Sequence, residues 1–368
     1  MHLYVHVPFC RKKCSYCGFA SAPPGPGDVE EYIRAVIREM QLQSPKVQGR
    51  RIQTLFLGGG TPSLLSPDHV KRLLAATRQY FALDDGAEIT LEANPDSVHT
   101  SNQVRAWRDM GITRISLGVQ SLDRDVLHFL GRTHSPEKAA EAVDFLGQGG
   151  MDNWGLDLIW GIPGQNVHSW LHTLEEVVAW DPAHLSLYSL CIEPDTPLAR
   201  WQWEHGLDWP GENAWEEMFL HGRKLLLQAG FVHYEISNYA RPGRECRHNS
   251  AIWRGEDYMG LGPAAVSTVG AIRGHNPDHL ADYVQMMDSG RYRPFEEILS
   301  REVKYREQVM LGLRTRRGID GFQAECCFED GFVDRLMQAG LLEAENGRMR
   351  LTPQGMLVSN EILARMHA

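Results

Sequence analysis

Residues 3–19 of the chain read LYVHVPFCRKKCSYCGF. The alternation of apolar side chains up to Val7 predicts a β-strand that ends at Pro8. Three cysteines follow the strand within eight residues, namely Cys10, Cys14 and Cys17. Thiolates spaced this closely indicate a bound group, and the alternatives are a zinc ion, a disulfide-forming set or an iron–sulfur cluster.

The spacing of the cysteines separates these alternatives. Structural zinc sites use paired knuckles, and no second knuckle follows in the sequence. A 4Fe–4S cluster held by three thiolates has one iron with an open coordination position. CxxxCxxC with Tyr16 before the last cysteine resembles the signature of the radical S-adenosylmethionine superfamily. In that family the open iron binds S-adenosylmethionine, and the reduced cluster cleaves it to a 5'-deoxyadenosyl radical. A zinc-stapled barrel without redox chemistry is the alternative from another class.

The composition sets the class of protein. The 368 residues are 43% hydrophobic and carry a formal net charge of −10, which predicts a sizeable core and no general affinity for nucleic acid. No apolar run approaches the roughly 18 residues that span a bilayer. Seven cysteines, an odd number, suit a reducing compartment, so we expect a cytoplasmic protein. The thiols outside the cluster motif are expected to be buried or partly buried: Cys191, Cys246, Cys326 and Cys327.

Strand and helix patterns alternate through the first half of the chain. We expect helices at 28–43, 67–81, 101–109, 136–148 and 167–179. The strands after the first are expected at 52–57, 89–93, 114–119, 155–159 and 185–190. Six strands that alternate with helices pair in parallel. The sequence therefore predicts an α/β fold, a partial (β/α)6 TIM-like barrel that falls short of the eight units of a closed barrel.

Polar residues and glycines concentrate where these strands end. GGGTP occupies residues 58–62, and Glu92, Gln120 and Asp157 lie at the ends of later strands. Ligands of parallel α/β folds lie at the carboxyl ends of the strands, so we expect the site on the same rim as the cysteines. Each feature taken alone also fits a tight turn or a strand-end cap. Together they suit a polar nucleoside.

Several stretches of the chain resemble one branch of this superfamily: LYVHVPFCRKKCSYC, FLGGGTPSLL, LEANPDS, RISLGVQSLD, LGRTH, DLIWGIPGQ and HLSLYSL. They look like the oxygen-independent coproporphyrinogen oxidase group, and most like its HemW-type members, over roughly residues 2–275. The resemblance implies a 4Fe–4S cluster held by Cys10, Cys14 and Cys17. It also implies cofactor contacts at Tyr4, Phe19, Gly59, Gly60, Thr61, Glu92, Gln120, Arg132 and Asp157.

Phe19 decides between the two kinds of member in this group. The true decarboxylases resemble one another in a fourth cysteine, CxxxCxxCxC, and the residue at that place here is Phe19. The chaperone-type relatives usually read CDF, from which Gly18 departs. Phe19 therefore argues against oxidative decarboxylation of coproporphyrinogen, and catalytic residues remain unassigned.

A second stretch relates to haem. The HemW-type proteins resemble each other in a HNxxYW motif associated with haem binding, and residues 248–253 here read HNSAIW, with Ile252 in place of Tyr. His248 suits an axial ligand of haem iron, and we expect the stretch to lie toward the barrel mouth. The alternative is that His248 and Asn249 hydrogen-bond a loop while Trp253 is core.

The last part of the chain has a different pattern of expected elements. Helices at 301–313, 321–326 and 330–339, followed by a hairpin around Asn346-Gly347, resemble a winged-helix domain. Ten Lys and Arg balance ten Asp and Glu from residue 301 onward, so we expect a lid or docking module and no nucleic acid. Its three exposed-looking arginines suit carboxylates such as porphyrin propionates: Arg314, Arg316 and Arg317.

These inferences predict three domains and one leading function. We expect a radical S-adenosylmethionine barrel at 1–230, barrel-closing sheet and loops with HNSAIW at 231–299, and the winged-helix-like domain at 300–368. The leading hypothesis is a haem chaperone that carries a 4Fe–4S cluster and S-adenosylmethionine and passes haem to an acceptor protein. The acceptor can be membrane-associated, and the chaperone itself can form a homodimer. The alternative is an oxygen-independent coproporphyrinogen III oxidase or another porphyrin-modifying radical enzyme.

Overall fold

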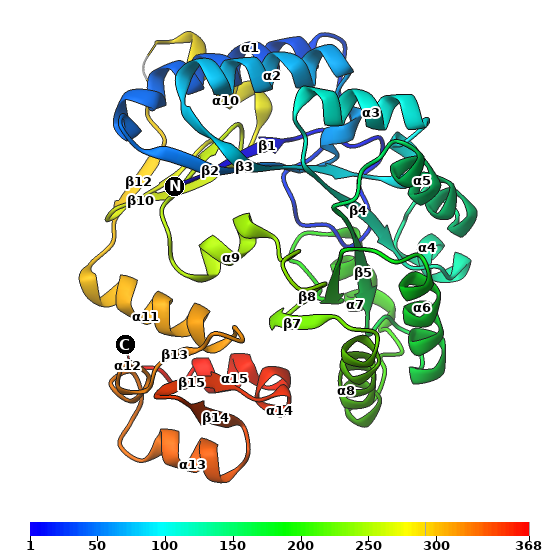
Figure 1. Ribbon diagram of the computed structural model, residues 1–368, viewed down its shortest axis with the longest axis vertical. Coiled ribbons are helices and arrows are strands. Elements are labelled where there is room, and N and C mark those ends of the chain that lie inside the picture. Colours follow the sequence, from blue (N-terminus) through cyan, green and yellow to red (C-terminus); the bar gives the residue numbers. More distant parts are fainter. Residues whose placement is uncertain (291, 368) are drawn as a thin grey trace.

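The centre of the molecule is a single twelve-stranded sheet (Figure 1). The computed structural model describes residues 1–290 and 292–367. The strand order is β12-β11-β10-β9-β1-β2-β3-β4-β5-β6-β8-β7. The six parallel strands that carry the predicted barrel are β1 (His2–Val7), β2 (Arg51–Gly59), β3 (Ala82–Ala93), β4 (Arg114–Gln120), β5 (Trp154–Trp160) and β6 (His184–Ser189). The outermost strands β12 and β7 are not paired with each other, so the barrel is open, and the prediction of a partial barrel is confirmed.

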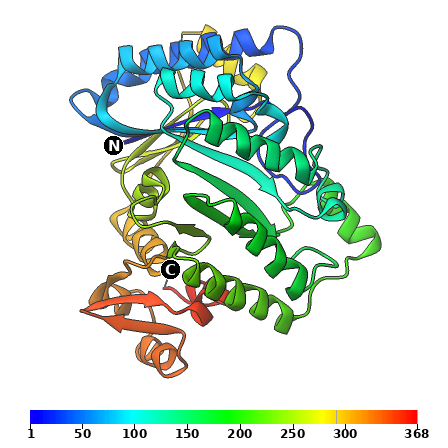
Figure 2. The same cartoon turned by 45° about the vertical axis from the view of Figure 1, so that its right-hand side comes forward.

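Helices cover one face of the parallel strands (Figures 1 and 2). The five predicted ones are α1 (Asp28–Gln43), α2 (Pro67–Tyr80), α3 (Ser101–Met110), α5 (Pro136–Gln148) and α6 (Val167–Ala179). Four of them begin at a side chain that accepts a hydrogen bond from the backbone N–H three residues later: Ser66, Thr100, Ser135 and Asn166. The short α4 (Arg124–Phe129) and the 3₁₀ turns η1 (Ser44–Val47), η2 (Pro62–Leu64) and η3 (Pro95–Ser97) fill the connections.

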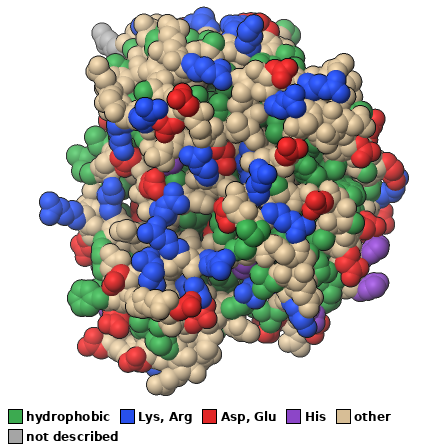
Figure 3. Space-filling model, in the orientation of Figure 1, with side chains coloured by type: hydrophobic (Ala, Val, Ile, Leu, Met, Phe, Trp, Pro, Cys, Tyr) green, Lys and Arg blue, Asp and Glu red, His purple; other side chains and the backbone are tan. Residues whose placement is uncertain are grey.

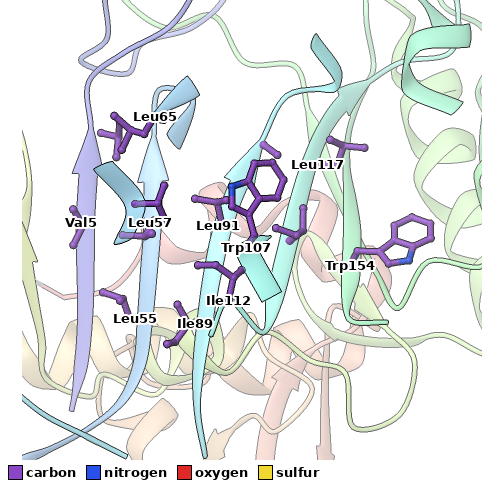
Figure 4. Packing of buried hydrophobic residues seen from close by; sticks show 14 of the residues in the cluster. Val5, Leu55, Leu57, Leu65, Ile89, Leu91, Trp107, Ile112, Leu117 and Trp154 are labelled. Atoms are coloured by element: carbon purple, nitrogen blue, oxygen red, sulfur yellow. The ribbon is translucent and has the colours of Figure 1, made fainter. Parts of the chain in front are cut away.

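The core lies between this layer of helices and the sheet (Figure 4). Trp107 of α3 is fully buried and belongs to one hydrophobic cluster with Leu91 of β3 and Leu117 of β4. Branched apolar side chains on the strands suit a sheet that is covered by helices. This packing fixes the strands relative to one another and brings their carboxyl ends to a common rim.

Residues 231–299 extend both edges of the sheet. β8 (Asn238–Ala240) pairs antiparallel with β6, and β7 (Val232–Glu235) pairs antiparallel with β8. On the other edge β9 (Tyr258–Leu261) pairs in parallel with β1, followed by antiparallel β10 (Val266–Val269), β11 (Ile272–His275) and β12 (Phe295–Ile298). The intervening α9 (Arg247–Trp253) spans the open side between the two edges (Figure 1).

The position of α9 corrects one expectation. The HNSAIW stretch does not lie at the barrel mouth, because α9 runs at the amino ends of the strands. β8 ends level with His184, the first residue of β6, and β9 begins level with His2, the first residue of β1. The chain between β8 and β9 must therefore join two points at the end opposite to the cysteines.

Three further helices were not predicted with bounds. They are α7 (Pro197–His205), α8 (Glu212–Gln228) and α10 (Leu280–Asp288). The helix α8 packs on α6, where the indole Nε1–H of Trp170 donates to the backbone oxygen of Met218 at 3.1 Å. The α7 side chains Trp201 and Trp203 are 55% and 90% exposed.

The C-terminal residues form a separate hydrophobic cluster. Their elements are α11 (Arg301–Leu313), β13 (Ile319–Asp320), α12 (Gly321–Glu325), α13 (Phe332–Gln338), β14 (Leu342–Glu345), β15 (Arg348–Leu351), α14 (Pro353–Leu357) and α15 (Ser359–Leu363). Asn346 and Gly347 both have positive φ, as a type I′ hairpin turn requires, so the predicted hairpin is confirmed. Acidic and basic side chains both occur over this part of the molecule (Figure 3).

Candidate functional site

A cavity of about 500 Å³ opens at the carboxyl ends of the parallel strands. All three motif cysteines line it. So do eight of the predicted cofactor contacts: Phe19, Gly59, Gly60, Thr61, Glu92, Gln120, Arg132 and Asp157. These residues come from the first loop, from four strand ends and from the turn after α4, so the strand topology brings distant segments of the sequence to one place.

Backbone hydrogen bonds hold the cysteine loop over this cavity. The N–H of Gly60 donates to Val7 O at 2.8 Å, and the N–H of Thr61 donates to Phe9 O at 2.7 Å. A Cβ at Gly60 would lie 2.5 Å from that same Phe9 oxygen, closer than real Cβ atoms approach, so only glycine fits. The GGGTP stretch is therefore a clamp for the start of the cysteine loop as well as part of the cavity wall.

The three cysteines are partly exposed and have different partners. The Cys10 Sγ lies 3.5 Å from Thr61 Oγ1, and the Arg132 Nη1–H donates to Cys14 Sγ at 3.5 Å. Burial raises the pKa of Cys17. Within residues 1–290 and 292–367, no three Cys, His, Asp or Glu side chains gather closely enough to hold a single metal ion. All three cysteines line one cavity, as the ligands of a single iron–sulfur cluster would.

Two buried carboxyl groups, Glu92 and Asp157, line the cavity. Burial, and then the neighbouring Asp157, raise the pKa of Glu92 to about 8. Burial also raises the pKa of Asp157, whose carboxylate accepts hydrogen bonds from Ser116 Oγ at 3.1 and 3.3 Å. The backbone N–H of Gly59 donates to Glu92 Oε2 at 3.0 Å. A ligand with an ammonium or sulfonium group would offset the cost of ionising both carboxyls in this partly buried position.

The cavity wall also carries a guanidinium, Arg132, and a strained backbone at Gln120 on β4, the strand between those of Glu92 and Asp157. Arg132 donates through Nη2 to the backbone oxygen of Gly118, while its Nε is a buried nitrogen without a hydrogen-bond partner among the described residues. Gln120 has φ 67°, in the left-handed region that side chains rarely adopt, and lies beside a bulge in the pairing of β4 with β5. Strain of this kind is concentrated at ligand sites.

Two of the predicted contacts lie elsewhere. Tyr4 Oη is 3.1 Å from His6 Nδ1, and the Tyr4 side chain faces neighbouring hollows instead of the cysteine cavity. His248 is 3% exposed, and its Nδ1 is 2.7 Å from Thr54 Oγ1 at the start of β2. Burial lowers the pKa of His248 to about 3. The hollow beside its ring is about 230 Å³, less than half the volume of the cysteine cavity.

Several residues of the cavity wall were not predicted from the sequence. Arg11 and Lys12 line the cavity beside the cysteines, and Ser116 lies on the inward face of β4, two residues before Gly118. A period-two pattern on β4, in which Ser116, Gly118 and Gln120 alternate with buried apolar residues, was the available signal. Cys191 and Cys326 are exposed, contrary to expectation, and Cys191 also lines this cavity.

Comparisons with known proteins agree with this site. The family model described as Radical SAM superfamily matches residues 4–177, and that described as HemN C-terminal domain matches residues 299–358. The haem chaperone HemW of Synechocystis sp. is 38% identical over 332 residues, which are 86% of this chain and 78% of that protein. HemW of Mycobacterium tuberculosis is 34% identical over 98% of this chain and 93% of its own, and HemW of Lactococcus lactis is 31% identical over 98% and 96%.

A solved structure extends the likeness to three dimensions. Coproporphyrinogen III oxidase HemN from Escherichia coli, described as a radical SAM enzyme, superposes with a TM-score of 0.84 at 25% identity. The match covers 98% of this chain and 88% of the enzyme. The two HemW proteins that span nearly the whole chain are each more than 30% identical to it. The chain belongs to the HemW family of the radical S-adenosylmethionine superfamily.

Proposed function

We propose that the protein is a haem chaperone that binds haem and transfers it to an acceptor protein. The observation that carries the proposal is the combination of full-length similarity to proteins named haem chaperone HemW with Phe19 in place of a fourth motif cysteine. The Phe19 side chain is 65% exposed on the cavity wall and offers no thiolate there. Membership of the superfamily implies a 4Fe–4S cluster and S-adenosylmethionine, and haem is the proposed cargo.

The proposal assigns the three cysteines to the cluster. Cys10, Cys14 and Cys17 would each supply one thiolate, and the fourth iron would be free to bind S-adenosylmethionine. When bound, the reduced cluster supplies an electron to the sulfonium of that cofactor. Arg132, within hydrogen-bond distance of Cys14 Sγ, stabilises the thiolate by its positive charge. The clamp formed by Gly60 and its neighbours holds the loop in place before the cluster arrives.

The remaining cavity residues would hold the cofactor. Thr61 and the backbone of the GGG stretch lie at the end of β2, where they suit the amino-acid part of S-adenosylmethionine. Burial raises the pKa values of Glu92 and Asp157, and the positive charge of the cofactor would favour the ionised carboxylates over the neutral acids. Gln120 presents an amide from a strained strand end and suits the hydroxyls or the base of a nucleoside.

Haem ligation by His248 has a structural condition. In this conformation the His248 ring packs against Phe56, with 5.1 Å between ring centroids, and contacts Thr54 through Nδ1. An iron porphyrin reaches the ring only if α9 moves away from the amino ends of β1 and β2. We therefore propose His248 as a haem-linked residue whose role depends on displacement of α9.

The rival function in the same fold is a coproporphyrinogen oxidase, which the TM-score of 0.84 to HemN favours. An anaerobic assay of the reconstituted protein with S-adenosylmethionine, reductant and coproporphyrinogen III separates the two functions, if it is followed by a haem titration of the same sample. We expect no protoporphyrinogen and about one haem per chain. Decarboxylation with stoichiometric 5'-deoxyadenosine would contradict the chaperone proposal.

We also propose a location and partners for the protein. In the described part of the chain, no helix combines the length and the apolarity needed to cross a membrane. We propose a cytoplasmic location, on the basis of the odd number of cysteines, and an acceptor that is a haem protein, membrane-associated or not. Size-exclusion chromatography with and without haem tests the expected homodimer, and a filter-binding assay tests the expected lack of affinity for nucleic acid.

A further inference from the structure

A second groove, of about 880 Å³, lies beside the cysteine cavity. The two hollows share Gly18, Phe19 and Ser21, so the end of the cysteine loop separates them. The loop and the turn after it form one wall of the second groove. Loop residues after β9, strands β10 and β11 and the start of α10 form the other, and β1 contributes Tyr4 and His6.

The loop wall is tied to the sheet by His6. This histidine is 5% exposed, and both of its ring nitrogens have partners, with Nδ1 3.1 Å from Tyr4 Oη and Nε2 2.8 Å from Ala20 O. A Cβ at Gly59 would lie 2.6 Å from the His6 ring, so the GGG stretch also presses against it. His6 therefore positions the wall and is not available as a ligand.

The opposite wall is held by a fully buried carboxyl group, Glu39 of α1. It accepts hydrogen bonds from the N–H of Gly262 at 2.7 Å, from Asn276 Nδ2 at 2.8 Å and from Tyr283 Oη at 2.7 Å. Ala264 in the same wall has φ 56°, a strained backbone that the surrounding hydrogen bonds maintain. The wall is therefore preorganised, although it faces solvent.

Two histidines project from this rigid wall into the groove. His275 ends β11, and its Nε2 lies 3.2 Å from Asp278 Oδ1 in a half-exposed pair. His279 is the exposed residue at the start of α10. A histidine that binds iron commonly has a carboxylate on its other nitrogen, which fixes the ring and makes it a stronger ligand. His275 with Asp278 has this arrangement.

The rest of the groove suits a flat apolar macrocycle with acidic substituents. Phe19, 65% exposed, offers an aromatic face, and Val266 and Leu280 are apolar residues of the opposite wall. The lining contains one cation, Lys13, and two carboxyl side chains, Asp28 and Asp278. The volume falls in the range of ~300–1,000 Å³ that ligand and cofactor sites occupy, and it is nearly four times the 230 Å³ beside His248.

We propose that this groove is an iron-porphyrin site in which His275, oriented by Asp278, would ligate the iron, with His279 beside it in the same wall. The ring lies between Phe19 and the β10–α10 wall, and Lys13 pairs with a propionate. The open side of the groove lets haem leave without movement of α9. The inference rests on the proposed haem-chaperone function and names a site for the cargo that is accessible in the present conformation.

The test is a haem titration of the full-length, cluster-loaded protein, followed by optical and electron paramagnetic resonance spectroscopy. The first variant is His275→Ala/His279→Ala. Its matched control is His168→Ala/His172→Ala on α6, where His172 forms a comparable exposed pair with Glu176 at 3.3 Å. The second variant, Val266→Trp, fills the groove and keeps both histidines. His248→Ala completes the set, and thermal unfolding verifies that each variant is folded.

We expect the double histidine variant to lose the imidazole-ligated spectrum and at least about tenfold in haem affinity, as loss of iron ligands predicts. Val266→Trp should weaken binding as well, and the α6 control should match the wild type. The groove site would be overturned if the double variant and Val266→Trp bound haem as tightly as the wild type and only His248→Ala lost haem affinity. The chaperone function would then remain intact. A wild-type chain that binds no haem would overturn both.

Discussion

The pH dependence of cofactor binding follows from Glu92. Its pKa is raised to about 8, so roughly one tenth of the carboxyl groups is ionised at pH 7 and roughly nine tenths at pH 9. A cationic ligand binds the ionised form, because a positive charge nearby favours the carboxylate. The apparent affinity for S-adenosylmethionine should therefore rise about tenfold between pH 7 and pH 9 and change little above that.

The substitution Glu92→Gln keeps the shape of the side chain and removes its charge. Isothermal titration calorimetry of the anaerobically reconstituted wild type and variant across pH 6–9 gives the ratio of their affinities. The cofactor's own titration cancels in this ratio, since both proteins bind the same molecule. We expect the ratio to be near one at low pH and to rise through pH 8. A ratio that stays constant over this range would refute the assignment of Glu92 as the group that receives the positive charge.

Three further predictions concern the cysteine loop, the contact of Thr54 with two buried histidines, and the core. Gly60→Ala should displace the cysteine loop and lower the iron and sulfide content after reconstitution, whereas Gly147→Ala, at an open helical position, should not; equal iron content in both would contradict the clamp. Thr54→Val leaves two buried histidine nitrogens unpaired and should lower the free energy of unfolding by about 2–3 kcal/mol in chemical denaturation, and an unchanged midpoint would argue against this contact. Trp107→Ala should cost about 3–5 kcal/mol, and Trp203→Ala, at 90% exposure, less than about 0.5 kcal/mol; similar losses would be inconsistent with the packing described.

The first half of the fold could be predicted from the sequence because local signals are strong there. Helices α1 and α6 have the predicted bounds, and α6 starts at the Asn166 cap. The strands after β6 are only two to four residues long, too short for a period-two pattern to indicate a partner. Their assignment to opposite edges of one sheet depends on pairing between distant segments, such as His2 with Tyr258.

The candidate site shows the same division. The cysteines and the strand-end residues could be placed together because parallel topology alone brings the carboxyl ends of strands to one rim. Tyr4 precedes the end of its strand, so its side chain faces a different hollow from the cysteines. The burial of the His248 side chain could not be predicted from its motif, because this burial depends on which end of the barrel α9 crosses. The second groove combines residues from 4 to 280, and no local pattern connects them.

The pairing of β1 with β9 has a consequence for biosynthesis. Residues 2–5 are synthesised well before their partners at 258–261, which follow more than 250 residues later in the sequence. Until then β1 is an exposed edge strand with Leu3 and Val5, a template for aggregation. The nascent chain can pair β1 with β2 early, but the other edge of β1 stays unmatched until β9 has been made. Because β1 leads directly into the loop that carries the cysteines, iron–sulfur assembly is expected to follow the synthesis of β9.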